Sequence, residues 1–75
     1  MGNRAEQTEK RRPRILSSSL DLFVYKGYHG TTVRDIAKRS EVSVGLLFHY
    51  FPTKQAILEE LLKTAEEGLD LTKTL

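Results

Sequence analysis

The chain has 75 residues, so it can form one small domain whose core is only marginally stable without partners. It contains no cysteine, which excludes disulfides and thiolate metal sites, and no apolar run approaches the roughly 20 residues of a membrane helix. The formal net charge is +2, with five basic residues against two acidic ones in 1–14, five against three in 15–54, and two against five in 55–75. We therefore expect a soluble, cytoplasmic protein without membrane contact, whose front part faces phosphate.

The first segment, residues 1–11, is polar and charged without periodicity, and we expect a flexible basic arm there. A helix is predicted to begin near Arg12, because Pro13 suits the first helical turn. An earlier start, capped by Thr8 and kinked at Pro13, is the alternative. Gly27 is expected to end this helix, since glycine readily takes the positive φ of the residue that follows a helix.

A second helix is predicted from the spacing of Thr32 and Asp35, which is that of a capping box. In this motif each side chain accepts a hydrogen bond from the backbone N–H of the other residue. Val33, Ile36 and Ala37 then lie on one face of the helix, and charged residues lie on the other. The sequence Ser40-Glu41-Val42 breaks the pattern and predicts a turn.

Ser43 can cap a third helix, VGLLFHYF, and Pro52 stops it because the residue before a proline is driven out of the helical region. A last helix begins at Pro52 or Thr53, and Gly68 ends or weakens it. Its expected apolar face consists of Ile57, Leu58, Leu61, Leu62, Ala65 and Leu69. The elements predict an all-α fold: a homeodomain-like three-helix helix-turn-helix bundle in residues 12–52, followed by a fourth, connecting helix in residues 53–75.

Two short helices joined by a tight turn make double-stranded DNA the first partner to test. The surrounding residues also follow the order I-L…A…L-F…G-Y, T-[ST]-v-x-x-I-A, a-G-V-S-x-G-x-[LI]-Y-x-[HY]-F and x-[ST]-K-x-x-L. The matching positions are Ile15, Leu16, Leu22, Phe23, Gly27, Tyr28, Thr31, Thr32, Val33, Ile36, Ala37, Val42, Ser43, Gly45, Leu47, His49, Phe51, Thr53, Lys54 and Leu58. On these residues, the span from about 15 to 62 resembles the N-terminal DNA-binding domain of TetR-type transcriptional repressors.

Three positions depart from the pattern of that family. Glu41 stands where the turn glycine is usual, Leu46 where a small or hydroxylated residue is common, and Phe48 where a tyrosine commonly touches phosphate. If Glu41 takes the positive φ of a turn glycine, the backbone conformation costs about 1 kcal/mol.

The resemblance implies a ligand-responsive repressor that binds an inverted-repeat operator as a homodimer. It also implies a C-terminal all-helical domain, missing from this sequence, that forms the dimer and binds a small-molecule effector. Leu69, Leu71 and Leu75 have nothing downstream to cover them, as expected of a truncated chain. A free-standing small helical protein that covers its last helix by self-association is the alternative.

A recognition helix enters the major groove with its N-terminal turn toward base edges. Ser43, Val44, Gly45 and Leu46 occupy that turn, where Gly45 allows close approach and Val44 and Leu46 offer only apolar contact, suited to a thymine methyl. Arg34 is the candidate for a bidentate guanine contact. His49 is a base reader, a phosphate partner or simply solvated, and DNA shape supplies the rest.

Other polar residues suit phosphate, which sets the register of binding rather than its sequence. The candidates are Thr31, Thr32, Ser43, Tyr50 and Lys54, and the family uses the lysine in this way. Phe48 is either a half-exposed DNA contact or a core residue, whereas Val42, Leu47 and Phe51 are expected in the core. Arg11, Arg12 and Arg14 either follow the DNA backbone or minor groove, or belong to a disordered arm.

Enzymatic readings fail because the necessary residues are not grouped. His29 and His49 lie far apart in sequence, and no metal, cofactor or nucleophile constellation is visible. The competing interpretation is a small helical protein–protein interaction domain that binds its partner through Val44, Leu46 and Phe48. The salt dependence of binding distinguishes the two interpretations. Binding driven by phosphate contacts weakens steeply as the salt concentration rises, whereas apolar docking barely responds.

Overall fold

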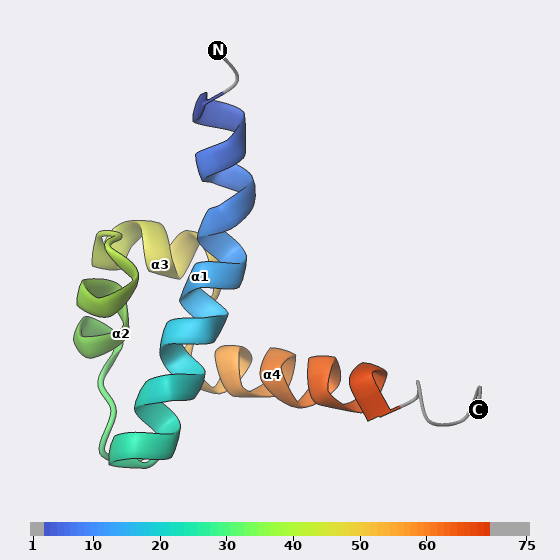
Figure 1. Ribbon diagram of the computed structural model, residues 1–75. Coiled ribbons are helices and arrows are strands. Elements are labelled where there is room, and N and C mark those ends of the chain that lie inside the picture. Colours follow the sequence, from blue (N-terminus) through green and yellow to red (C-terminus); the bar gives the residue numbers. More distant parts are fainter. Residues whose placement is uncertain (1–2, 70–75) are drawn as a thin grey trace.

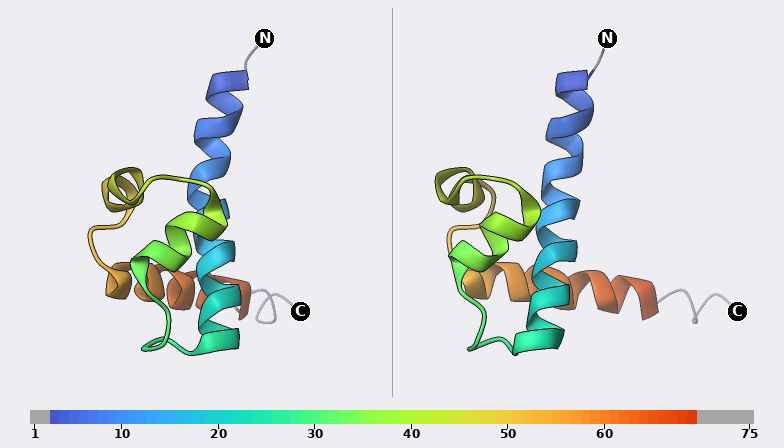
Figure 2. Two further views of the ribbon diagram at one scale, coloured as in Figure 1. Left: turned by 90° about the vertical axis from the view of Figure 1, so that its left-hand side faces the viewer. Right: turned by 60° about the vertical axis from the view of Figure 1, so that its left-hand side comes forward.

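The computed structural model describes the backbone of residues 3–69 and the side chains of residues 10–67. Within that range the fold is all-α, with helices α1 (Asn3–Lys26), α2 (Val33–Ser40), α3 (Val44–Tyr50) and α4 (Lys54–Leu69). The two short helices α2 and α3 lie together on one side of α1, whereas α4 crosses α1 and extends away from them (Figure 1). Figure 2 shows α2 lying against α1.

The first helix is longer than the sequence predicted. It begins at Asn3, so the expected start near Arg12 is wrong, and Pro13 and Thr8 both lie inside α1. Residues 3–12 are mostly alanine, arginine, lysine, glutamate and glutamine, which have good helix propensity. Because this segment lacks an apolar stripe, a search for periodicity does not detect it. Its first turns project beyond the other three helices (Figure 1).

The core contains one fully buried aliphatic residue from each helix: Ile15, Ile36, Leu47 and Ile57. Ala37 and Phe51 complete it. Burying an aliphatic side chain of this size stabilises a fold by about 1.5–3 kcal/mol. The inner face predicted for the second helix is therefore confirmed, and so are the inner positions Leu47 and Phe51. On α4 the apolar stripe is only partly used, because Leu62 is 56% exposed.

The start of α2 is the predicted capping box. The Asp35 N–H donates to Thr32 Oγ1, and the Thr32 N–H donates to Asp35 Oδ2, each over 3.0 Å. Lys26 Nζ adds an ion pair of 2.9 Å to the same carboxylate oxygen. These contacts, the backbone hydrogen bond first, lower the pKa of the Asp35 carboxyl from 3.8 to about 2. Ser43 caps α3 in a simpler way, since its Oγ accepts from the Leu46 N–H over 3.0 Å.

The turn between α2 and α3 has the left-handed backbone that a turn glycine would provide. Glu41 has φ 61° and ψ 40°, and among described residues it is the one non-glycine residue with positive φ. Gly27, after α1, has φ 83°, as predicted for a helix end. The Glu41 carboxylate lies 3.6 Å from Arg14 NH1, but both side chains are largely exposed, so this pair contributes little stability.

We expect the variant Glu41→Gly to raise the free energy of unfolding by about 1 kcal/mol, because glycine takes positive φ without the steric cost that glutamate bears. Urea denaturation measures the change. The matched control is Arg14→Ala, which removes the ion pair alone and should change stability by less than about 0.5 kcal/mol. A loss of stability in Glu41→Gly would contradict the strain interpretation.

The capping box predicts a defined loss of stability in acid. Folding lowers the pKa of Asp35 to about 2, so the carboxylate stabilises the native state above the ordinary pKa of 3.8 and this contribution is lost as pH falls toward 2. Stability measured by denaturation between pH 5 and pH 2 should therefore fall more steeply in the wild type than in Asp35→Asn, whose amide oxygen can still accept from Thr32 but does not titrate. Parallel pH profiles would contradict this assignment.

Candidate nucleic-acid interface

The buried face of α3 packs in the core and thereby fixes the direction of its exposed face. Leu47 is fully buried and Val44 packs against the core, whereas Gly45 and His49 are exposed and Phe48 is 44% exposed. Leu46 is half-buried. The core thus fixes the rotation of this seven-residue helix, and the surface that faces outward is short and mostly apolar.

Arg34 on α2 is the arginine predicted to contact a guanine, and its side chain is available to a partner. Its side chain is exposed and forms no ion pair with any described side chain. Two neighbouring cations are engaged instead, since Lys26 pairs with Asp35 and Arg39 pairs with Asp21, both at 2.9 Å. The charge that α2 can offer to an anion therefore comes from Arg34 and the exposed Lys38.

The environment of Thr31 contradicts its predicted contact with phosphate. Its side chain is 1% exposed, and its Oγ1 lies 2.8 Å from the carbonyl oxygen of Gly27 and 3.1 Å from that of Leu22. The hydroxyl is thus used inside the loop between α1 and α2 and cannot reach DNA. Thr31 was assigned as a contact because a threonine at a helix entrance has the same sequence pattern whether it faces solvent or a carbonyl group.

Lys54, the first residue of α4, lies in an unexpected environment. Its Nζ donates to the carbonyl oxygens of Tyr28 over 2.7 Å and Thr31 over 3.0 Å, and it lies 4.2 Å from the centre of the Tyr28 ring. The side chain therefore fastens α4 to the loop between α1 and α2. An ammonium group has three N–H bonds, so two are accounted for by these carbonyls.

The remaining polar candidates are partly occupied by local contacts. The hydroxyl oxygens of Thr32 and Ser43 each accept a capping hydrogen bond, which leaves their own O–H available as a donor. Tyr50 is half-buried and packs against the core, with the His49 ring edge-on at 5.8 Å between centroids. The rings of His49 and Tyr50 therefore contact each other at the end of α3.

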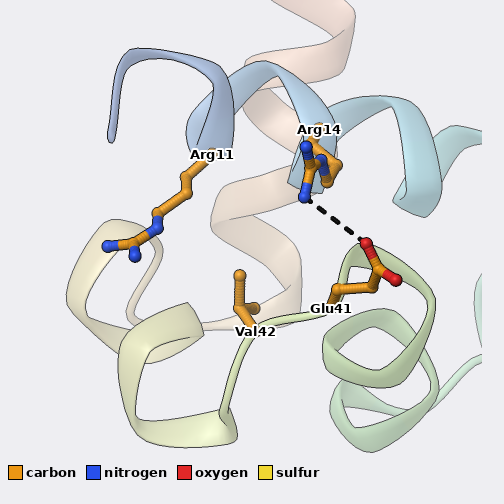
Figure 3. A pocket seen from close by; sticks show the side chains of 4 residues that line it. All are labelled: Arg11, Arg14, Glu41 and Val42. Carbon is orange, nitrogen blue, oxygen red and sulfur yellow. Dashed lines mark ion pairs between the residues drawn. The ribbon is translucent and has the colours of Figure 1, made fainter. Parts of the chain in front are cut away.

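A small pocket flanks α3 where α1 passes the turn. It is lined by Arg11, Arg14, Glu41 and Val42, and Figure 3 shows Arg14 extending from α1 to Glu41 in the turn, while Arg11 extends from α1 on the other side of Val42. Arg14 is neutralised by Glu41, whereas Arg11 forms no ion pair within the described part of the chain.

Arg12 has a structural role that sequence reasoning missed. Its guanidinium lies 5.2 Å from the centre of the Phe51 ring and pairs with Glu60 over 3.2 Å. It thereby links α1 to the residue that ends α3 and to α4. No local spacing signals this contact, because the partners are far away in sequence.

Neither a metal-binding cluster nor a membrane-spanning helix occurs among the described residues. No group of three or more histidine, aspartate or glutamate side chains in residues 10–67 could hold a metal ion. None of the helices within residues 3–69 has both the length and the apolar character needed to cross a bilayer. The surface instead presents the exposed face of α3 beside basic side chains, Arg34 and Arg11, that form no ion pair with any side chain the structure describes.

Comparison with known proteins identifies this arrangement. Residues 15–61 match the family described as bacterial regulatory proteins, tetR family. The uncharacterized HTH-type transcriptional regulator YuxN of Bacillus subtilis is 44% identical over 48 residues, which cover 64% of this chain and 16% of YuxN. The HTH-type transcriptional repressor KstR of Mycolicibacterium smegmatis is 36% identical over 66 residues, 88% of this chain and 32% of KstR.

The fold has a counterpart among crystal structures. A chain assigned to the tetR family of transcription regulators, from Shewanella sp. PV-4, superimposes with a TM-score of 0.68 and 44% identity, over 69% of this chain and 28% of that one. The chain thus spans less than a third of the length of these relatives.

The contacts of Lys54 predict that it stabilises the fold. We expect Lys54→Met, which keeps an apolar stem over Tyr28, to lower the free energy of unfolding by about 1–3 kcal/mol, because the Thr31 carbonyl loses its donor and the Tyr28 carbonyl keeps only the Thr31 N–H, at 3.3 Å. Urea denaturation measures this, with Lys63→Met on the exposed part of α4 as the control. Equal stability of the two variants would show that the contacts of Lys54 contribute nothing.

Proposed function

Because the chain belongs to the tetR family of bacterial regulatory proteins, we propose that it is a transcriptional regulator that binds double-stranded DNA through α3 and the first turn of α2. The observation that carries this proposal is an outward-facing α3, fixed by the buried Leu47, beside Arg34 on the adjacent helix, which forms no ion pair within residues 10–67. An α-helix of this kind fits the major groove of B-DNA.

Arg34 is proposed as the residue that reads a guanine. Guanine presents two acceptors, O6 and N7, that match the two parallel N–H groups of a guanidinium, and such a pair discriminates against other bases by about 1–3 kcal/mol. His49 is a second reader or a phosphate partner. Phosphate contacts are proposed for Thr32, Ser43, Tyr50 and Lys54, the last through its remaining N–H bond.

The operator is proposed to be an inverted repeat bound by a homodimer. One module of this size makes few contacts, and tethering two of them turns the second binding step into an intramolecular one. The dimer would be formed by a C-terminal domain outside this sequence, which would also bind a small-molecule effector and thereby change the spacing of the two α3 helices. Repression is the proposed outcome, as in the relative whose name describes it as a repressor.

A second function is favoured by one observation, the exposure of apolar side chains on α3. Phe48 is 44% exposed beside the half-buried Leu46 and Val44, which would suit the surface of a protein partner. Raising the salt concentration separates the two proposals. DNA binding that rests on phosphate contacts weakens by orders of magnitude, whereas apolar docking hardly changes.

The experiment is selection from a random duplex pool, with this chain fused at its C-terminus to a parallel dimeric coiled coil. We expect enrichment of an inverted repeat with a guanine at one position of each half-site. The variant Arg34→Ala should lose the preference at that position alone, because it removes the bidentate contact and leaves phosphate contacts unchanged.

Two results would contradict these assignments. Unchanged base preference in Arg34→Ala would remove Arg34 as a reader while DNA binding stands. No enrichment at low salt, from a fusion shown by circular dichroism to be helical, would favour the protein-interaction function instead.

A further inference from the structure

The outward surface of α3 has almost no hydrogen-bonding capacity near its start. Residues 44–48 are Val-Gly-Leu-Leu-Phe, so polar side chains appear only at Ser43 before them and at His49 and Tyr50 after them. The Ser43 oxygen already accepts the Leu46 N–H. A helix with this surface cannot read most base edges by hydrogen bonds.

The apolar side chains are arranged around a gap. With about 100° between successive helical residues, Leu46 and Phe48 lie on the two sides of Gly45. They are about 3 Å apart along the helix axis, but about 200° of rotation separates them, so they project about 160° apart around the helix. In the major groove they would therefore face different base pairs on either side of the helix.

Gly45 itself is not required by the fold. A Cβ at this position would meet only Ser43 Oγ, at 4.0 Å, and the residue does not have positive φ. Glycine within a helix costs about 0.5–1 kcal/mol relative to alanine. This differs from Gly30, where a Cβ would clash with the carbonyl oxygen of Lys26. Nothing in the described structure therefore requires glycine at position 45.

From these observations, and resting on the proposed function, we infer that α3 reads its operator through thymine methyl groups. Leu46 and Phe48 would each contact the C5-methyl group of a different A·T pair, while the backbone at Gly45 lies against the base edges. In the major groove thymine is the base that presents a methyl group, and the other three bases present polar groups at the corresponding edge. Placing those polar groups against leucine or phenylalanine would leave them without partners, which disfavours them.

The test uses the inverted repeat obtained by selection and replaces single thymines by deoxyuridine, which lacks only the methyl group. We expect one or two positions in each half-site to be sensitive. Each methyl should change the dissociation constant about fourfold, and about fifteenfold when both half-sites are altered, from the free energy of burying one carbon group. Thymines outside these positions serve as controls within the same duplex.

The protein variants assign each methyl to a side chain. In Leu46→Ala the sensitive position for that residue should bind thymine and deoxyuridine equally, and Phe48→Ala should do the same at the other sensitive position. Leu62→Ala, a truncation of an exposed leucine on α4, should retain the full sensitivity of the wild type. Gly45→Ala should be at least as stable as the wild type in urea yet bind the operator at least tenfold more weakly.

The outcomes separate this inference from the proposed function. If an inverted repeat is enriched but deoxyuridine leaves the affinity unchanged at every position, methyl reading is wrong and DNA binding stands. If Gly45→Ala binds as the wild type does, the close approach of the backbone is wrong. If no duplex is enriched, the inference and the proposed function are both overturned.

Discussion

The arrangement of the domain depends on the hydrogen bonds made to carbonyl groups at the end of α1 and in the loop between α1 and α2. Thr31 Oγ1 serves the carbonyls of Leu22 and Gly27, and Lys54 Nζ serves those of Tyr28 and Thr31 itself. Buried backbone groups without partners are costly, so these two side chains fix the path of a loop without regular structure. That loop leads directly to the cap of α2. The position of the proposed reading residue Arg34 therefore follows from contacts made by residues that are not themselves readers.

Ion pairs also determine which basic side chains on this surface are available to a partner. Exposed pairs contribute little to stability, and four such pairs occur among the described side chains. They nevertheless occupy Lys26, Arg39, Arg12 and Arg14, which are half of the basic residues of α1 and α2 whose side chains are described. Arg34, Lys38 and Arg11 form no ion pair within residues 10–67. These residues therefore carry positive charge that is not paired with a carboxylate, where phosphate would lie under the proposed function.

What the sequence predicts well is what depends on neighbours within a few residues. The capping box at Thr32, the cap at Ser43, the positive φ at Gly27 and the fully buried Ile36 and Leu47 all follow from local spacing. The start of α1 was missed because a polar helix has no apolar period. Thr31 was misassigned because its acceptors come from the preceding helix end and loop, and the contacts of Lys54 were not foreseen because its acceptors lie 23 and 26 residues earlier. A donor that faces such a carbonyl has the same sequence pattern as one that faces DNA, and only tertiary structure separates them.

The physical character of α3 implies that affinity and sequence preference would come from different residues. Phosphate contacts made by basic and hydroxyl groups supply binding that depends steeply on salt and little on sequence. Apolar contacts with bases depend on sequence but hardly on salt, and each discriminates weakly compared with a bidentate hydrogen-bonded pair. A reader with Arg34 and an apolar helix face must therefore combine many small preferences. Two copies on one operator would double each of those preferences in free energy, so dimerisation would supply discrimination that a single copy of this surface lacks.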